Sequence, residues 1–339
     1  MAYRVVQFKN ASGVLAAVWP RTEYSFTDHA CREEKFEEQI MNKKEFKKLT
    51  EKGILYLDGA TGSNMYLAGM PKGVCTEEWI LEHEEVLINL QRQYMEAGSQ
   101  VVYAPTFGAN RFSLAVKGRS CTADQVGEMN KRLVDLSQRA VGTRCLVAGD
   151  VSPTGRALVS QGGETSVDEL FEVYREQITY LTEAGVDLIG AETMLSVEET
   201  MVVLDAAASV SDIPVMCSLT LEADGNAYYG GNGVEAMETL QAMGAVAVGV
   251  NCSVGPDQLE NVIRNMKAVA EVPVIAKPNA GLPFIDDQGN AVYSMGPEEF
   301  AKNMKMLVNA GASVVGGCCG TTPAYIRKLR LALEGKLIR

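Results

Sequence analysis

The sequence predicts one (β/α)8 TIM barrel of the α/β class, preceded by an N-terminal extension. From Gly53 onward, eight short apolar runs rich in β-branched residues alternate with amphipathic stretches of helical length. The roughly 280 residues that hold this pattern match the usual size of such a barrel. Several helices also end in a glycine just before the next strand, as at Gly98, Gly185, Gly244 and Gly311.

The eight strands are expected where the apolar runs lie. Their ranges are 54–58, 100–106, 144–150, 187–192, 213–220, 245–252, 272–277 and 312–318. A doubly wound open sheet is the competing architecture, but it calls for a glycine-rich phosphate turn after the first strand. The segment 58–62 (Asp-Gly-Ala-Thr-Gly) lacks that full fingerprint.

Residues 1–52 are expected to form the extension and residues 53–339 the barrel. The first forty residues show no sustained period, and 33–38 resembles a solvated helical stretch. Two interpretations of residues 1–40 stay open. Either Met41 is the biological start, or the segment is a genuine docking arm or flap.

Composition excludes several classes of protein. There are 31 basic and 43 acidic residues, a net charge of −12, which argues against a nucleic-acid binder. With 47% hydrophobic and 22% charged residues, the chain can bury a full core. No membrane span or signal peptide is predicted, and the eight scattered cysteines suit a reducing compartment, so a cytoplasmic location is expected.

Polar side chains end almost every predicted strand. In a barrel these ends meet at one face, where active sites lie. Singly, each such residue is often only a helix N-cap, but together they predict a polar mouth. The residues are Asp58, Thr106, Asp150, Glu192, Thr220, Asn251, Cys252, Lys277, Asn279, Cys318 and Cys319.

Three of these residues, Cys252, Cys318 and Cys319, suggest a metal site. Three thiolates can hold zinc and leave its fourth position open for a substrate. A buried core thiol for Cys252, or a redox pair for the two adjacent cysteines, are the alternatives. Neither His29 nor His83 lies on a predicted strand, so a histidine-rich site has little support.

Several motifs resemble the homocysteine S-methyltransferase family. They are Gly-Gly-Cys-Cys-Gly-Thr-Thr-Pro at 316–323, Gly-Val-Asn-Cys at 249–252, Leu-Asp-Gly-Ala-Thr-Gly-Ser at 57–63, Pro-Thr-Phe-Gly-Ala-Asn-Arg at 105–111 and Lys-Pro-Asn-Ala-Gly-Leu-Pro at 277–283. The similarity runs in order from 54 to 330. The 105–111 and 277–283 motifs look most like the homocysteine-binding module of cobalamin-dependent methionine synthase.

The resemblance implies roles for particular residues. Cys252, Cys318 and Cys319 would bind Zn²⁺, which would activate the thiol of homocysteine with no further catalytic group. Asp58 and Glu192 would hold the substrate ammonium. The substrate carboxylate would be held by the backbone N–H groups of Thr61 and Gly62 and by the Thr106 hydroxyl, and Asn251 would also belong to the substrate site.

Two departures from the family pattern lie at the mouth. Thr61 and Ser63 replace the Met and Thr of the family's first motif, and Ala104-Pro105 replaces the Thr-Asn of its second. Both changes put the exact thiol substrate in doubt more than the chemistry.

The implied reaction transfers a methyl group to homocysteine and gives methionine. A separate methylated corrinoid protein is the expected donor. The alternatives are a free donor, S-methylmethionine or betaine, held by the aromatic residues Tyr228, Tyr229 and Phe284, or a different thiol acceptor. Two rival interpretations are a Schiff-base enzyme that uses Lys277 and a zinc-bound, non-catalytic partner of a corrinoid protein.

Overall fold

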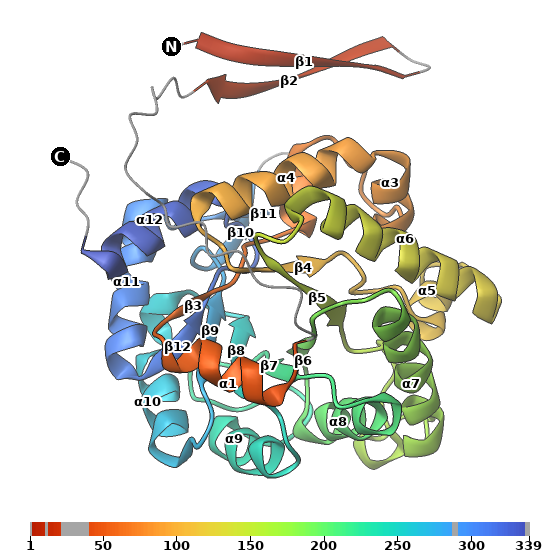
Figure 1. Ribbon diagram of the computed structural model, residues 1–339, viewed down its shortest axis with the longest axis vertical. Helices are drawn as coiled ribbons and strands as arrows, with labels where there is room; N and C mark the ends of the chain where they lie inside the picture. Colours follow the sequence, from red (N-terminus) through yellow and green to blue (C-terminus); the bar gives the residue numbers. More distant parts are fainter. Residues whose placement is uncertain (1, 11–12, 22–40, 287–290, 336–339) are drawn as a thin grey trace.

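Eight parallel strands form the barrel that the sequence predicts. A computed structural model of the chain describes residues 2–10, 13–21, 41–286 and 291–335. The strands are β3 (Leu55–Tyr56), β4 (Val101–Ala104), β5 (Leu146–Val151), β6 (Leu188–Met194), β7 (Val215–Leu219), β8 (Ala247–Cys252), β9 (Val274–Pro278) and β12 (Ala312–Val315). They follow one another round the barrel in chain order (Figure 1), which confirms the predicted fold.

The helices cover the outside of the barrel (Figure 1). Their apolar faces pack on the strands, and capping boxes start the two longest, α6 (Ala123–Val141) and α7 (Val167–Glu183). The helices are α1 (Lys43–Glu51), α2 (Gly62–Leu67), α3 (Thr76–Glu82), α4 (Glu84–Ala97), α5 (Arg111–Val116), α6 (Ala123–Val141), α7 (Val167–Glu183), α8 (Val197–Val210), α9 (Gly233–Ala242), α10 (Glu260–Val269), α11 (Pro297–Ala310) and α12 (Pro323–Glu334).

β3 and β4 are the two ends of the eight-strand order, and hydrogen bonds that include side chains join them and close the barrel. The Gln100 N–H donates to the carbonyl of Tyr56 at 2.7 Å, and the Tyr56 N–H donates to the Gln100 side chain at 3.0 Å. Beyond them, the Tyr103 N–H donates to Oδ2 of Asp58 at 2.9 Å. The carboxylate of Asp58 therefore takes the place of a backbone acceptor and is held where the ends of β3 and β4 meet.

Helix α1 lies across the amino-terminal end of the barrel (Figure 1). Asn42 caps it by accepting from the N–H groups of Lys44 and Glu45. Phe46 is 1% exposed and belongs to the cluster of side chains, including Leu55 and Leu57, that fills the barrel interior. The segment before residue 53 thus contributes to the barrel core.

Two hairpins stand outside the eight-stranded barrel. β1 (Ala2–Asn10) pairs antiparallel with β2 (Gly13–Arg21), in a region where the sequence pattern predicts no strand. β10 (Pro283–Ile285) pairs with β11 (Ala291–Tyr293) in the segment after β9. The helical stretch expected at 33–38 and the residue His29 lie outside the described residues. Within those residues, no helix has the length and apolar character needed to cross a bilayer.

Candidate active site

The three cysteines singled out by the sequence come together at the carboxyl end of the barrel. Cys252 ends β8, and Cys318 and Cys319 follow β12. Their Sγ atoms all lie within 4.8 Å of one another. Cys252 and Ser253 adopt φ values of 59° and 53°, a left-handed turn that non-glycine residues rarely adopt. This turn ends the extended strand at the residue whose thiol joins the cluster.

The loop that carries Cys318 is held by the ends of the strands beside it. The Gly317 N–H donates to the carbonyl of Asp58 at 3.0 Å, and the Cys318 N–H donates to the carbonyl of Pro278 at 2.8 Å. The Thr321 hydroxyl closes the loop by donating to the carbonyl of Cys318 at 2.7 Å. A Cβ on Gly317 would stand 2.5 Å from that hydroxyl oxygen, so the loop requires glycine there.

The cluster fits a zinc ion. Zn–S bonds of about 2.3 Å in a tetrahedron place the sulfur atoms about 3.8 Å apart, within the spread of this cluster. Hydrogen bonds from Cys252 and Cys318 lower the pKa of the Cys319 thiol to about 3, and the Tyr293 hydroxyl adds to this effect. Hydrogen bonds with Cys318 and Cys319 raise the pKa of the Cys252 thiol. For Cys318, the hydrogen bond with Cys252 lowers the pKa, but the one with Cys319 and burial outweigh it. One of the three thiols is therefore a thiolate, the form that binds zinc, and bound zinc would displace the protons of the other two.

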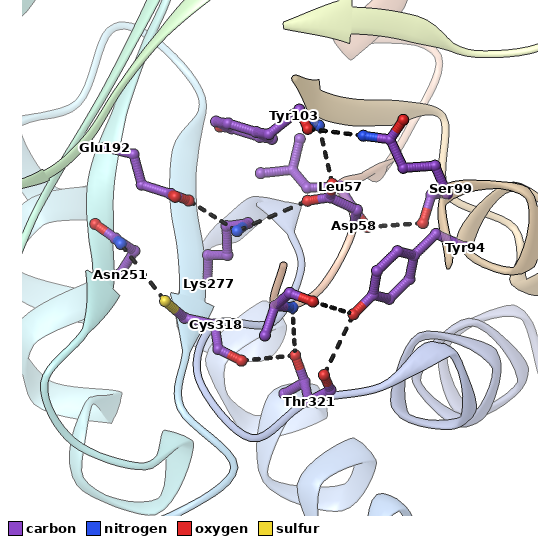
Figure 2. A network of polar contacts seen from close by, with 12 residues as sticks. Leu57, Asp58, Tyr94, Ser99, Tyr103, Glu192, Asn251, Lys277, Cys318 and Thr321 are labelled. Carbon is purple, nitrogen blue, oxygen red and sulfur yellow. Dashed lines mark hydrogen bonds and ion pairs between the residues drawn. The ribbon is translucent and has the colours of Figure 1, made fainter. Parts of the chain in front are cut away.

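A buried ion-pair cluster lies beside Cys318 (Figure 2). Nζ of Lys277 is 2.7 Å from Oε1 of Glu192 and 3.7 Å from Oδ1 of Asp58. The same ammonium lies 4.8 Å from the centre of the Tyr103 ring. All three charged residues are buried, so their charges interact in a medium of low polarity.

The pKa shifts of this cluster follow from burial and from the charges themselves. Burial raises the pKa of Asp58 to about 7, although Lys277 opposes the shift. Burial also raises the pKa of Glu192. For Lys277, burial alone would lower the pKa, but the Glu192 and Asp58 carboxylates outweigh it, so the net pKa is well above the usual value. Lys277 is therefore an ammonium ion.

Thr106 and Asp150 hold each other at the ends of β4 and β5. The Thr106 hydroxyl donates to the carbonyl of Asp150 at 2.9 Å and accepts from the Asp150 N–H at 2.9 Å. Thr106 is completely buried. The resemblance assigns this hydroxyl to the substrate carboxylate, and in this structure its one hydrogen is donated to the backbone of Asp150.

Asn251 also has partners inside the protein. Its Oδ1 accepts from the Thr193 N–H at 2.9 Å, and its Nδ2 donates to the Thr193 hydroxyl at 2.7 Å. Nδ2 lies 3.9 Å from the Cys318 sulfur (Figure 2). Thr193 has a left-handed φ of 60°. The side chain of Asn251 therefore connects β8 to β6 next to the thiols.

Thr61 and Gly62 stand at the start of α2, on the loop after β3. Thr61 makes no side-chain cap, so it does not occupy the N–H groups of the first helical turn. The loop is attached to the one after β12, since the Ala60 N–H donates to the Thr321 hydroxyl at 3.1 Å. Asn64 strengthens this link by donating to the carbonyl of Thr321 at 2.9 Å.

Sequence reasoning missed part of this arrangement. It placed Lys277 and Asp150 at the mouth but gave neither a role in substrate binding, and it did not select Tyr293. The position of Lys277 and Asp150 at strand ends was a usable signal, but their partners depend on contacts across the barrel. An ammonium ion held by two carboxylates is a poor nucleophile, which disfavours the Schiff-base interpretation.

Comparisons with known proteins agree with the motifs. A sequence model of the homocysteine S-methyltransferase family matches residues 55–333. Methionine synthases of Mycobacterium tuberculosis and Mycobacterium leprae are each 29% identical over 298 residues. These matches cover 83% of this chain and 24% of each synthase, so the chain spans about a quarter of the length of these curated relatives.

The fold agrees with a solved structure. The homocysteine methyltransferase MmuM from Escherichia coli, in its metallated form, superposes with a TM-score of 0.69 at 23% identity. The superposition covers 84% of this chain and 98% of that chain.

Proposed function

This chain belongs to the homocysteine S-methyltransferase family and is a methyltransferase, and we propose that it methylates the thiol of homocysteine, forming methionine, at a zinc ion held by Cys252, Cys318 and Cys319. The observation that carries this proposal is the convergence of three thiols, from two separate strand ends, within 4.8 Å. When bound, zinc would deprotonate the substrate thiol and hold it in the open fourth position.

The protein's own residues bind and orient the amino-acid head of the substrate. Asp58 and Glu192 attract the ammonium group because they are buried carboxylates beside the thiols. The N–H groups of Thr61 and Gly62, at a helix start tied to the loop after β12, receive the carboxylate. In this proposal Asn251 and Thr106 position neighbouring residues and do not bind substrate, since their side chains already have partners.

The methyl donor that we propose is a methylated corrinoid carried by a separate protein. The motif similarity to the homocysteine module of cobalamin-dependent methionine synthase supports this choice, as do the methionine synthase relatives. Exposed apolar side chains on the loops after β4, β7 and β9 offer a surface for such a partner. They are Phe107, Tyr228, Tyr229, Leu282 and Phe284. We also propose a cytoplasmic location, where reducing conditions preserve the thiols.

A free cationic donor is the second candidate. Tyr228 and Tyr229 are 54% and 56% exposed, so they are accessible to a sulfonium or quaternary ammonium group. Assays of the zinc-loaded protein with homocysteine and each donor in turn distinguish the two. Methionine formed with a methylcorrinoid protein supports our choice, and turnover with S-methylmethionine or betaine alone overturns it.

The zinc site is tested by metal analysis of cysteine variants. We expect about one zinc per chain in the wild type and its loss in Cys252→Ala, Cys318→Ala and Cys319→Ala. Cys217→Ala is the matched control, because Cys217 is a buried thiol of β7 outside the cluster. Full zinc retention in any one of the three variants would remove that residue from the site.

A further inference from the structure

Three carboxylates and one ammonium group are buried together at the mouth of the barrel. Asp58, Asp150 and Glu192 are 1%, 5% and 7% exposed, and Lys277 is 3% exposed. Oδ1 of Asp58 and Oδ1 of Asp150 have no hydrogen-bond partner among the described residues. Buried carboxylates are costly unless cations or N–H donors compensate them. One lysine does not balance three carboxylates, so the cluster retains protons on its acids, which a bound cation can replace.

Lys277 already occupies the space between two of the three carboxylates. Its Nζ lies 2.7 Å from Glu192 and 3.7 Å from Asp58 (Figure 2). These are the two residues to which the family resemblance gives the substrate ammonium. A substrate ammonium must therefore share them with Lys277, and it needs a carboxylate of its own.

Asp150 is the acid of this cluster that has no ion-pair partner within 4 Å among the described residues, whereas Glu192 and Asp58 both pair with Lys277. The backbone N–H and the backbone carbonyl of Asp150 each form a 2.9 Å hydrogen bond with the Thr106 hydroxyl. Its position is thus set independently of its side chain. Burial raises its pKa well above the usual value, and the nearby charge of Glu192 raises it further. A cation bound at Oδ1 would compensate both effects.

We propose that Asp150 binds substrate, and that together with Asp58 and Glu192 it receives the α-ammonium group of the acceptor thiol while Lys277 balances the remaining negative charge. This inference rests on the proposed function, since it describes how the same site recognises its thiol. The new element is Asp150, which adds a third carboxyl group to the two that the family resemblance already assigns to the substrate ammonium. A thiol without the amino group would bring no cation to Asp150, which would keep its proton.

The test compares two thiols that differ only in the amino group. Homocysteine and 4-mercaptobutanoate are titrated calorimetrically into zinc-loaded wild type, Asp150→Asn and Glu199→Gln, and KM and kcat are measured for both with the donor that supports turnover. Glu199 is the matched control, a buried carboxylate already paired with Tyr174 at 2.7 Å. We expect Asp150→Asn to weaken homocysteine binding roughly 10- to 100-fold and 4-mercaptobutanoate binding less than about 2-fold. Glu199→Gln should leave the ratio of the two affinities unchanged.

Other outcomes contradict the inference. An equal loss for both thiols in Asp150→Asn would show a structural role only, and wild type that binds both thiols equally would exclude an ammonium subsite. If Asp150→Asn does not fold, Asp150→Ser is measured in the same way and the same ratio decides. Failure of the proposed function would give a different result, because zinc-loaded wild type would then neither bind nor methylate homocysteine.

Discussion

Replacing Phe46 with alanine tests whether helix α1 is an integral part of the barrel. Phe46 is 1% exposed and packs at the amino-terminal end of the barrel, in a cluster with interior side chains of the strands such as Val101, Leu146 and Leu188. The substitution leaves a cavity where the ring had been. Backbone hydrogen bonds hold the surrounding strands in place, so these strands can relax into that space only in part.

The expected loss follows from this burial. Phenylalanine to alanine at a fully buried site costs about 3–5 kcal/mol of the free energy of unfolding. Unfolding entropy is about 2.1 cal/mol/K per residue, which gives about 0.6 kcal/mol/K for a barrel of this size. The melting temperature should therefore fall by about 5–8 °C.

Differential scanning calorimetry measures this shift against Lys47→Ala, an exposed neighbour on the same helix. The control should change the melting temperature by less than about 1 °C. A chain that starts at Met41 keeps Phe46 and should retain the barrel's melting temperature, whereas one that starts at Gly53 should lose more than Phe46→Ala does. A melting temperature of Phe46→Ala within about 2 °C of wild type would refute the packing argument.

Two further predictions concern the site. Asn251→Ala leaves the Thr193 N–H without its acceptor. We expect this change to cost about 1–3 kcal/mol of the free energy of unfolding and to weaken zinc binding at Cys252. Thermal melts measure the stability and chelator competition measures the zinc affinity, and wild-type values in both would contradict the positioning role of Asn251. In the zinc-free protein, burial raises the pKa of Asp58 to about 7, so the folded state keeps a proton that the unfolded state loses near the ordinary aspartate pKa of 3.8. The free energy of unfolding should then fall by up to about 1.4 kcal/mol per pH unit as pH rises from about 4 to about 7. Urea titrations across this range should show a shallower fall in Asp58→Asn, and an equal or steeper fall would refute the assignment.

Much of the fold could be predicted because barrel strands have a strong local signal. A parallel strand covered on both faces is apolar along its whole length, and each of the eight predicted runs overlaps an observed strand. The predicted ends were less accurate. The run 54–58 contains β3 at Leu55–Tyr56 only, because Asp58 leaves the ladder and bonds to Tyr103 through its side chain.

The composition of the mouth could also be predicted, since the carboxyl ends of barrel strands share one face. That rule is enough to bring Cys252 next to Cys318 and Cys319, although β9 lies between their strands. Such reasoning names the residues that meet but does not say which atoms they use. Thr106 and Asn251 illustrate this, because each is a strand-end residue whose side chain has a partner inside the protein.

The amino-acid pattern alone was sufficient for the barrel, its polar face and the three thiols, because strand periodicity and strand-end position are properties of short segments. The tertiary structure was needed for the rest. It placed the Lys277 ammonium between Glu192 and Asp58, left Oδ1 of Asp150 without a hydrogen-bond partner in the described part of the chain, and put Phe46 into the barrel interior. Each of these depends on distances between segments far apart in the chain, and in a low-polarity interior those distances determine which charges are balanced.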